Sequence, residues 1–137
     1  MVIFGAPIED AYQEEHAVKA ALEMQREFHQ LSRKWDLQGR SIRIGVGINS
    51  GNAIVGNVGS TQRMEYTAIG DTVNLASRLE SATKELAVDI LISEYTYNAV
   101  RGAFKTNKVG SIQVKGRIDP VQTYSIDPLP EDDGSAV

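Results

Sequence analysis

Apolar and polar residues alternate strictly between residues 42 and 48, which is the period of a strand with one buried face. The apolar positions are Ile42, Ile44, Val46 and Ile48, and the residues between them are Arg43, Gly45 and Gly47. Two glycines on the second face indicate that a ligand or another backbone packs closely there. Turn-forming residues follow at 49–52 and predict a hairpin into a second strand over residues 53–56.

A helical period is present upstream, where apolar residues recur at steps of three and four. Its members are Ala17, Ala21, Met24, Phe28, Leu31 and Trp35. This stripe is expected to face the core, and Gly39 is a plausible end for the helix. Before the helix, the apolar run at 2–4 predicts a buried strand that ends at Pro7, because proline cannot continue a ladder. A chain that opens inside a strand suggests a domain cut at its N-terminus.

Helical and extended patterns alternate through the second half of the chain. The predicted elements are, in order, a glycine-bearing loop with a short extended stretch over 57–70, a helix from Asp71 to about Thr83, a strand over 88–92, a short helix capped by Ser93, and two strands over 110–114 and 121–126. Asp71 is expected to be the N-cap of its helix. Hairpins mixed with crossovers indicate an α+β fold, with a ferredoxin-like sheet and helices mainly on one face.

Composition places the chain among ordinary globular domains. Its 137 residues suit one domain, and 42% apolar with 23% charged residues argue against disorder. The net charge of −4 does not suggest a nucleic-acid partner, which usually requires a clustered basic face. The absence of cysteine excludes disulfides and cysteine-ligated zinc. No apolar run approaches the ~18 residues of a membrane helix, although a longer parent protein could carry a membrane anchor elsewhere. The lack of cysteine suits a reducing cytosol, so we expect a cytoplasmic domain. Residues 128–137 are expected to form a disordered tail.

The segment from Tyr66 to Leu79 carries the most informative polar residues. Asn74 and Arg78 are four residues apart, so they share one face of the predicted helix near its N-terminus. An amide and a guanidinium near helix N–H groups of partial positive charge suit phosphate oxygens. A solvated polar helix face explains the same pattern. The glycines at 45, 47 and 51 imitate a dinucleotide fingerprint, but their spacing differs from it and no helix opens after them.

The residues around this helix resemble those of one family. The string GDTVNLASRLE at 70–80 is similar to the signature helix of class III adenylate and guanylate cyclases. Further similar segments, in the family's order, are Phe4–Pro7, Gly45–Gly51 and Val114–Gly116. Residues 1–127 thus resemble part of a class III nucleotide cyclase catalytic domain, without the N-terminal portion of that domain.

The resemblance implies an enzyme that converts ATP to cyclic AMP and pyrophosphate. In the family's pattern Asn74 orients the ribose, Arg78 stabilises charge on the α-phosphate, and Lys115 binds the triphosphate. Thr67 falls where the family selects its base, and a threonine there suits adenine. The alternatives are a guanylate cyclase and a non-catalytic regulatory or dimerisation module. A diguanylate cyclase is disfavoured because its Gly-Gly-Asp/Glu-Glu-Phe turn is missing.

Cofactors and partners are implied by the same resemblance. Two divalent ions, Mg²⁺ or Mn²⁺, complete the family's site, but its two metal-binding aspartates would lie upstream of Val2. We interpret Asp71 as a helix cap and not as a metal ligand. Two domains would meet head to tail as a homodimer, and upstream sensor domains would fit the family. This chain alone is therefore expected to hold half of a site and to be inactive.

Overall fold

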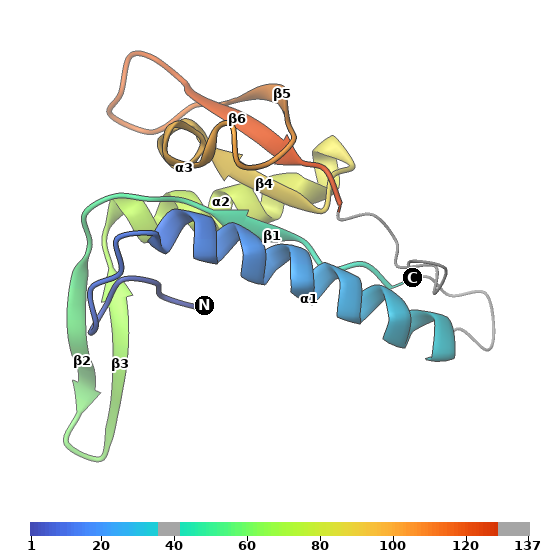
Figure 1. Ribbon diagram of the computed structural model, residues 1–137. Coiled ribbons are helices and arrows are strands. Elements are labelled where there is room, and N and C mark those ends of the chain that lie inside the picture. The colour runs from blue at the N-terminus through green and yellow to red at the C-terminus, as the bar shows by residue number, and fades with distance from the viewer. Residues whose placement is uncertain (36–41, 129–137) are drawn as a thin grey trace.

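The computed structural model describes residues 1–35 and 42–128. Helices and strands alternate within these ranges (Figure 1). In chain order the elements are α1 (Gln13–Trp35), β1 (Val46–Ile48), β2 (Ile54–Ser60), β3 (Arg63–Ile69), α2 (Asp71–Leu86), β4 (Ile90–Ser93), α3 (Glu94–Val100), β5 (Thr106–Ile112) and β6 (Val121–Ile126). The predicted α+β class is confirmed.

Four strands form one sheet in the order β1-β4-β6-β5, and β2 and β3 form a separate hairpin. β1 runs parallel to β4, whereas the β4–β6 and β6–β5 pairs are antiparallel. A parallel pair requires a crossover connection, and here the connection contains β2, β3 and α2. The β2–β3 hairpin, residues 54–69, projects away from the rest of the domain (Figure 1). We call this hairpin the arm.

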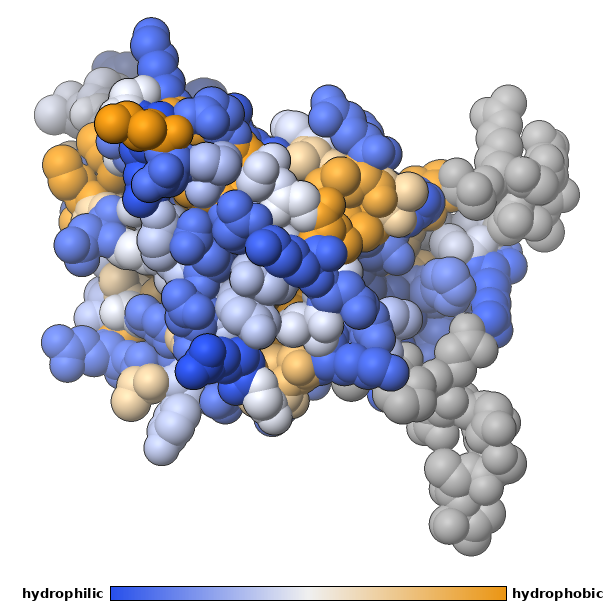
Figure 2. All heavy atoms as spheres, turned by 90° about the horizontal axis from the view of Figure 1, so that it is seen from above, coloured by the Kyte–Doolittle hydropathy of each residue, from blue (hydrophilic) through white to orange (hydrophobic). Residues whose placement is uncertain are grey.

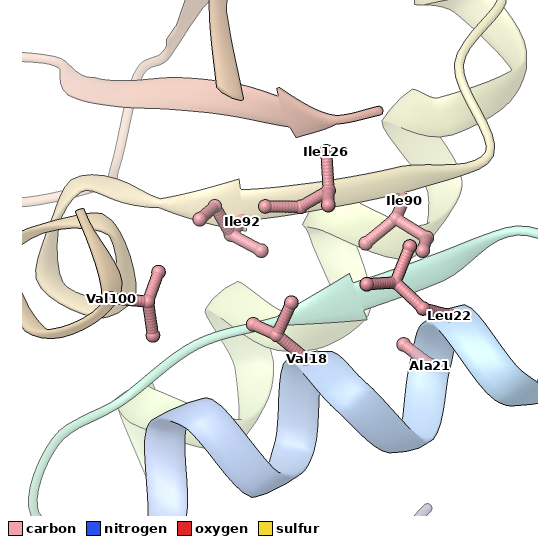
Figure 3. Packing of buried hydrophobic residues seen from close by; sticks show 7 residues of the cluster. All are labelled: Val18, Ala21, Leu22, Ile90, Ile92, Val100 and Ile126. Carbon is pink, nitrogen blue, oxygen red and sulfur yellow. The ribbon is translucent and has the colours of Figure 1, made fainter. Parts of the chain in front are cut away.

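Helices α1 and α3 pack on one face of the four-stranded sheet. Every residue of β4 is buried, and Ile90 and Ile92 point toward α1 (Figure 3). The buried cluster on this face consists of Val18, Ala21, Leu22, Ile90, Ile92, Val100 and Ile126. Full burial of one Val, Leu or Ile side chain contributes about 1.5–3 kcal/mol, so this cluster fixes α1 to the sheet.

Helix α2 covers the opposite face. Leu75 and Leu79 pack with Leu91, which is the β4 residue between the two that face α1. The helix approaches β1 so closely that a Cβ atom at Gly47 would lie 2.3 Å from the backbone nitrogen of Glu80. The glycine face of this strand therefore packs against another backbone, which was one of the two predicted reasons. Two of the three helices, α1 and α3, therefore lie on one face of the four-stranded sheet, and α2 lies on the other.

The helix predicted from the apolar stripe is present as α1, but its buried face differs from the predicted one. Val18, Ala21 and Leu22 are buried. By contrast Met24, Leu31 and Trp35 of the predicted stripe are exposed. The physical reason is geometric, because the C-terminal half of α1 extends beyond the sheet and has little to pack against (Figure 1). Gly39, the predicted end of this helix, lies outside the described residues.

Two strand predictions are wrong. Residues 2–4 are not in a strand, because no strand within the described ranges pairs with them. The predicted hairpin between 42–48 and 53–56 does not form, since β2 pairs with β3. β3 contains the short extended stretch that was predicted within residues 57–70. The side chain of Asn49 connects the turn after β1 to α2 and β4. Its side-chain amide donates to the Thr72 carbonyl at 2.9 Å, and its side-chain oxygen accepts from the Ser93 hydroxyl at 2.6 Å.

Helix ends were predicted with mixed success. Asp71 is the first residue of α2 and not its N-cap; that position belongs to Gly70, whose φ of 130° favours glycine. The capping role of Ser93 is confirmed, because its hydroxyl accepts a hydrogen bond from the Thr96 N–H at 3.3 Å. The last two predicted strands are present, although β5 begins at Thr106 and ends at Ile112.

The surface seen from above is largely hydrophilic, and its hydrophobic side chains occur in separate groups (Figure 2). Several exposed apolar side chains belong to the arm, among them Val58, Met64 and Tyr66. None of the helices in residues 1–35 and 42–128 combines the length and the apolar character needed to cross a bilayer. The predicted disordered tail lies outside the described residues except for Pro128.

Candidate functional site

Asn74 and Arg78 lie on the solvent side of α2. The helix buries Leu75 and Leu79 against the sheet, so the residues one position earlier on each turn face outward. Both Asn74 and Arg78 are exposed, one turn apart. Within the described ranges, neither side chain is engaged in a hydrogen bond or an ion pair. The pair is therefore free to contact a ligand.

The start of α2 is fixed by the loop that follows β1. The Thr72 hydroxyl donates to the Asn52 carbonyl at 2.5 Å, and the Asn49 amide holds the Thr72 carbonyl. Asn49 is itself held by Ser93, which is fully buried. The first turn of the helix is thus tied to both β4 and the β1–β2 loop, which limits the positions that Asn74 can take.

Thr67 lies on β3, three residues before the helix cap Gly70. It is half-buried and pairs with Gly56 on β2. Side chains that are directly opposite on an antiparallel pair share one face, and Gly56 has none. A Cβ atom at Gly56 would meet nothing within 4 Å, so open space lies beside Thr67.

Lys115 lines a cleft of about 350 Å³ at the first turn of α2. The residues around the cleft are Asn49, Ser50, Gly51, Asp71, Thr72, Leu75, Tyr95, Val114, Lys115 and Arg117. This volume is at the lower end of the range for small-molecule sites. Two cations and one carboxylate line the cleft, so it carries positive charge in a chain whose net charge is −4.

Arg117 is held at the rim of the cleft by Tyr95. Its guanidinium donates a hydrogen bond to the Tyr95 hydroxyl and lies 5.5 Å from the centre of the ring. This hydrogen bond raises the pKa of Arg117 above its already high ordinary value, so the side chain is always a cation. Sequence reasoning missed both residues. Arg117 could have been found from its position, because it is a basic residue only two positions after Lys115. No sequence signal indicated Tyr95.

The four residues predicted from the sequence do not share one cleft in this chain. Lys115 lies in the cleft at the N-terminus of α2, whereas Asn74 and Arg78 lie outside it on the exposed helix face. Thr67 lies on the arm. The helix and its N-terminus nevertheless connect them, because Thr67 precedes it, Asn74 and Arg78 are on it, and Lys115 lies beside its first turn.

No group of three His, Asp or Glu side chains that could hold a metal ion occurs in residues 1–35 and 42–128. Asp71 lines the cleft, but it lacks the further carboxylates that a hard divalent cation requires. The described residues therefore do not fit a two-metal centre.

Comparison with known proteins gives a consistent result. The chain matches the family described as "Adenylate and Guanylate cyclase catalytic domain" over residues 1–128. It is 42% identical over 114 residues to "Adenylate cyclase, terminal-differentiation specific" of Dictyostelium discoideum, which covers 81% of this chain and 5% of that protein. It is 38% identical over 125 residues to "Soluble guanylate cyclase 89Da" of Drosophila melanogaster, and this match covers 90% of this chain and 17% of that protein.

A solved structure is similar as well. The crystal structure of the adenylyl cyclase CyaB from P. aeruginosa superposes with a TM-score of 0.77 and 36% identity, covering 94% of this chain and 67% of that one. The chain spans only a small part of the length of the two curated relatives, which act on different nucleotides by their names. On this evidence the chain belongs to the class III family of adenylate and guanylate cyclase catalytic domains.

Proposed function

We propose that this chain supplies the transition-state half of an adenylate cyclase site. The observation that carries the proposal is the pair Asn74 and Arg78, exposed one turn apart on α2 without a hydrogen bond or ion pair in the described parts of the chain. A donor amide and a guanidinium held on a rigid helix suit a ligand that develops negative charge. Because both side chains face solvent, the remainder of the site must come from a facing surface.

The proposed reaction is an intramolecular phosphoryl transfer. The ribose 3′-oxygen of ATP forms a bond to the α-phosphorus as the bond from that phosphorus to the bridging oxygen breaks. The products are cyclic AMP and pyrophosphate, and the hydroxyl proton is lost to solvent or to a base. Positioning and charge stabilisation dominate such reactions. Asn74 orients the ribose, Arg78 stabilises charge on the α-phosphate, and Lys115 binds the phosphates beyond it.

Adenine is the proposed base because of Thr67. A hydroxyl can donate or accept a hydrogen bond, and the space beside Gly56 leaves room for a purine edge. The second candidate is a guanylate cyclase, which the identity to the Drosophila protein favours. A non-catalytic cyclase-like module is the remaining alternative.

A second cyclase domain, arranged head to tail, is the proposed partner. The half-site on α2 is open to solvent, and the arm beside it exposes Val58, Met64 and Tyr66. Exposed apolar side chains that adjoin an incomplete site are typical of an interface. Two divalent ions, Mg²⁺ or Mn²⁺, are proposed cofactors of the complete site, with ligands from outside the described residues. A cytoplasmic location also remains a proposal.

Complementation tests this function. The chain is mixed with a family domain that keeps its metal-binding aspartates but lacks the amide and guanidinium that correspond to Asn74 and Arg78. We expect metal-dependent cyclic AMP synthesis from the mixture. Arg78→Ala should lower kcat by about 10²–10³ with little change in KM, because the lost interaction forms mainly in the transition state. Lys84→Ala, which removes another exposed cation from α2, is the matched control.

Three outcomes would contradict the proposal in different ways. A raised KM with kcat preserved in Arg78→Ala would make Arg78 a ground-state binder. Binding of the two domains without any product would favour the non-catalytic module. Metal-dependent synthesis by this chain alone would show that a complete site forms without a partner of another type.

A further inference from the structure

The turn after β5 places two cations on either side of one glycine. Lys115 and Arg117 both line the cleft at the start of α2, and Gly116 between them has a φ of 87°. The only carboxylate among the lining residues of this cleft is that of Asp71. A cleft with this charge balance in an acidic chain favours an anion with more than one negative charge.

Arg117 is held in place before any ligand arrives. Its N–H donates to the Val114 carbonyl at 3.1 Å, and its carbonyl accepts from the Gln113 side-chain amide at 2.8 Å. The guanidinium rests over Tyr95 and donates to its hydroxyl. A preorganised side chain loses less conformational entropy when it binds.

The position of the guanidinium leaves donors for a ligand. A guanidinium has five N–H groups in a planar fork that matches phosphate oxygens. One of them is used by the Tyr95 hydroxyl, and no carboxylate within the described residues forms an ion pair with Arg117. No side chain caps α2 either, and Asp71 and Thr72 of its first turn line the same cleft. Helix N-termini of this kind favour phosphate.

We propose that Arg117 is a second phosphate-binding residue beside Lys115, and that Tyr95 holds it in position. The ligand class is a polyphosphate, namely the terminal phosphates of the nucleotide and the pyrophosphate that leaves. This inference rests on the proposed function and extends it, because it assigns a side chain to the leaving group. Lys115 supplies a mobile point charge, whereas Arg117 supplies a fixed fork of donors.

Binding of inorganic tripolyphosphate to the full 137-residue chain tests the assignment without catalysis. Isothermal titration calorimetry is run in a buffer free of divalent ions, so that metal chelation does not contribute. The variants are Arg117→Ala, Arg117→Lys and Tyr95→Phe. The matched control is Arg101→Ala, which removes an exposed arginine that does not line the cleft. Urea midpoints verify that each variant is folded.

We expect Arg117→Ala to raise the Kd about tenfold, which corresponds to one charge-assisted hydrogen bond. Arg117→Lys should retain part of the affinity, because it keeps the charge and loses the fork. Tyr95→Phe should weaken binding by a smaller factor, because the ring remains and the hydroxyl is lost. Arg101→Ala should leave the Kd unchanged.

Equal Kd values for Arg117→Ala and Arg101→Ala would overturn the proposal and reduce Arg117 to a packing partner of Tyr95. No binding by the unmodified chain at millimolar tripolyphosphate would also overturn it. The result is separable from the proposed function. Binding that depends on Arg117, together with failed complementation, would keep this site and reject the cyclase activity. Successful complementation, together with tripolyphosphate binding that does not depend on Arg117, would keep the cyclase activity and reject this site.

Discussion

Replacing Gly47 with alanine tests the packing of α2 on β1, on which the position of the candidate site depends. The added Cβ atom would lie 2.3 Å from the Glu80 nitrogen, 2.5 Å from the Ala76 oxygen and 2.9 Å from the Leu79 carbonyl carbon. Ordinary van der Waals contact begins at 3.4 Å, so strand and helix must separate locally by about 1 Å. All three atoms belong to the backbone, so no side-chain rotation relieves the contact.

The cost can be estimated from this geometry. Overpacking in a well-packed core costs about 1–3 kcal/mol, and we expect the upper end because backbone must move. With a urea m-value of about 1.5 kcal/mol/M, a loss of about 3 kcal/mol lowers the unfolding midpoint by about 2 M. This is a large fraction of the free energy of unfolding of a typical domain, which is about 5–15 kcal/mol.

Urea unfolding followed by circular dichroism measures the effect. Gly56→Ala is the matched control, because a Cβ atom at Gly56 meets nothing within 4 Å and its midpoint should change little. Combining Gly47→Ala with Glu80→Ala should not restore stability, because the contact involves the Glu80 backbone. A midpoint for Gly47→Ala equal to that of Gly56→Ala would refute the close approach of α2 to β1.

Three further predictions concern the cap, the acid response and the base. Ser93→Ala should lower the free energy of unfolding by about 1–2 kcal/mol, since a buried cap is lost, while Ser60→Ala at the exposed tip of the arm should have no effect in the same urea assay. The hydrogen bond from His16 lowers the pKa of Asp10, so this pair stabilises the fold above the ordinary aspartate pKa of 3.8 and ceases to do so as the pH falls through the lowered value. His16→Ala should return the pKa of Asp10 toward 3.8 in an NMR titration, and an unchanged pKa would exclude His16 as the cause. In the complemented enzyme, ATP should exceed GTP in kcat/KM by at least about tenfold if Thr67 contacts adenine, and equal use of both nucleotides would contradict that role.

Local features of the fold could be predicted from the sequence. The helix that carries Asn74 and Arg78 follows from its apolar spacing, and the cap at Ser93 follows from the chemistry of a hydroxyl before a helix. The close approach at Gly47 was also indicated, because a glycine on a strand face signals that something packs there. For the helix and its cap, the cause lies within a few residues of its effect. At Gly47 the sequence indicated only that something packs there, because the contacting backbone of Ala76 to Glu80 is about 30 residues away.

Features that depend on distant residues could not be predicted. The path of the chain after β1 is set by Asn49, whose partners Thr72 and Ser93 are 23 and 44 residues away. The hydrogen bond between Arg117 and Tyr95 joins residues that are 22 positions apart, and no sequence pattern near either residue indicates it. The candidate site residues could be named because short stretches of sequence carry them. The cleft could not be predicted, because its lining residues come from segments that are far apart in the sequence.

The arm and the body of the domain differ in how readily their backbone amides exchange with solvent. The arm is a two-stranded ladder with exposed side chains, and such hairpins are marginally stable by themselves. β4, in contrast, has a neighbour on each side and is wholly buried. Local opening of the arm therefore requires less free energy than opening of the body. Thr67 lies on the arm, whereas Arg78 lies on a helix that is anchored to the core. We therefore expect a docking partner to order the surroundings of Thr67 far more than those of Arg78.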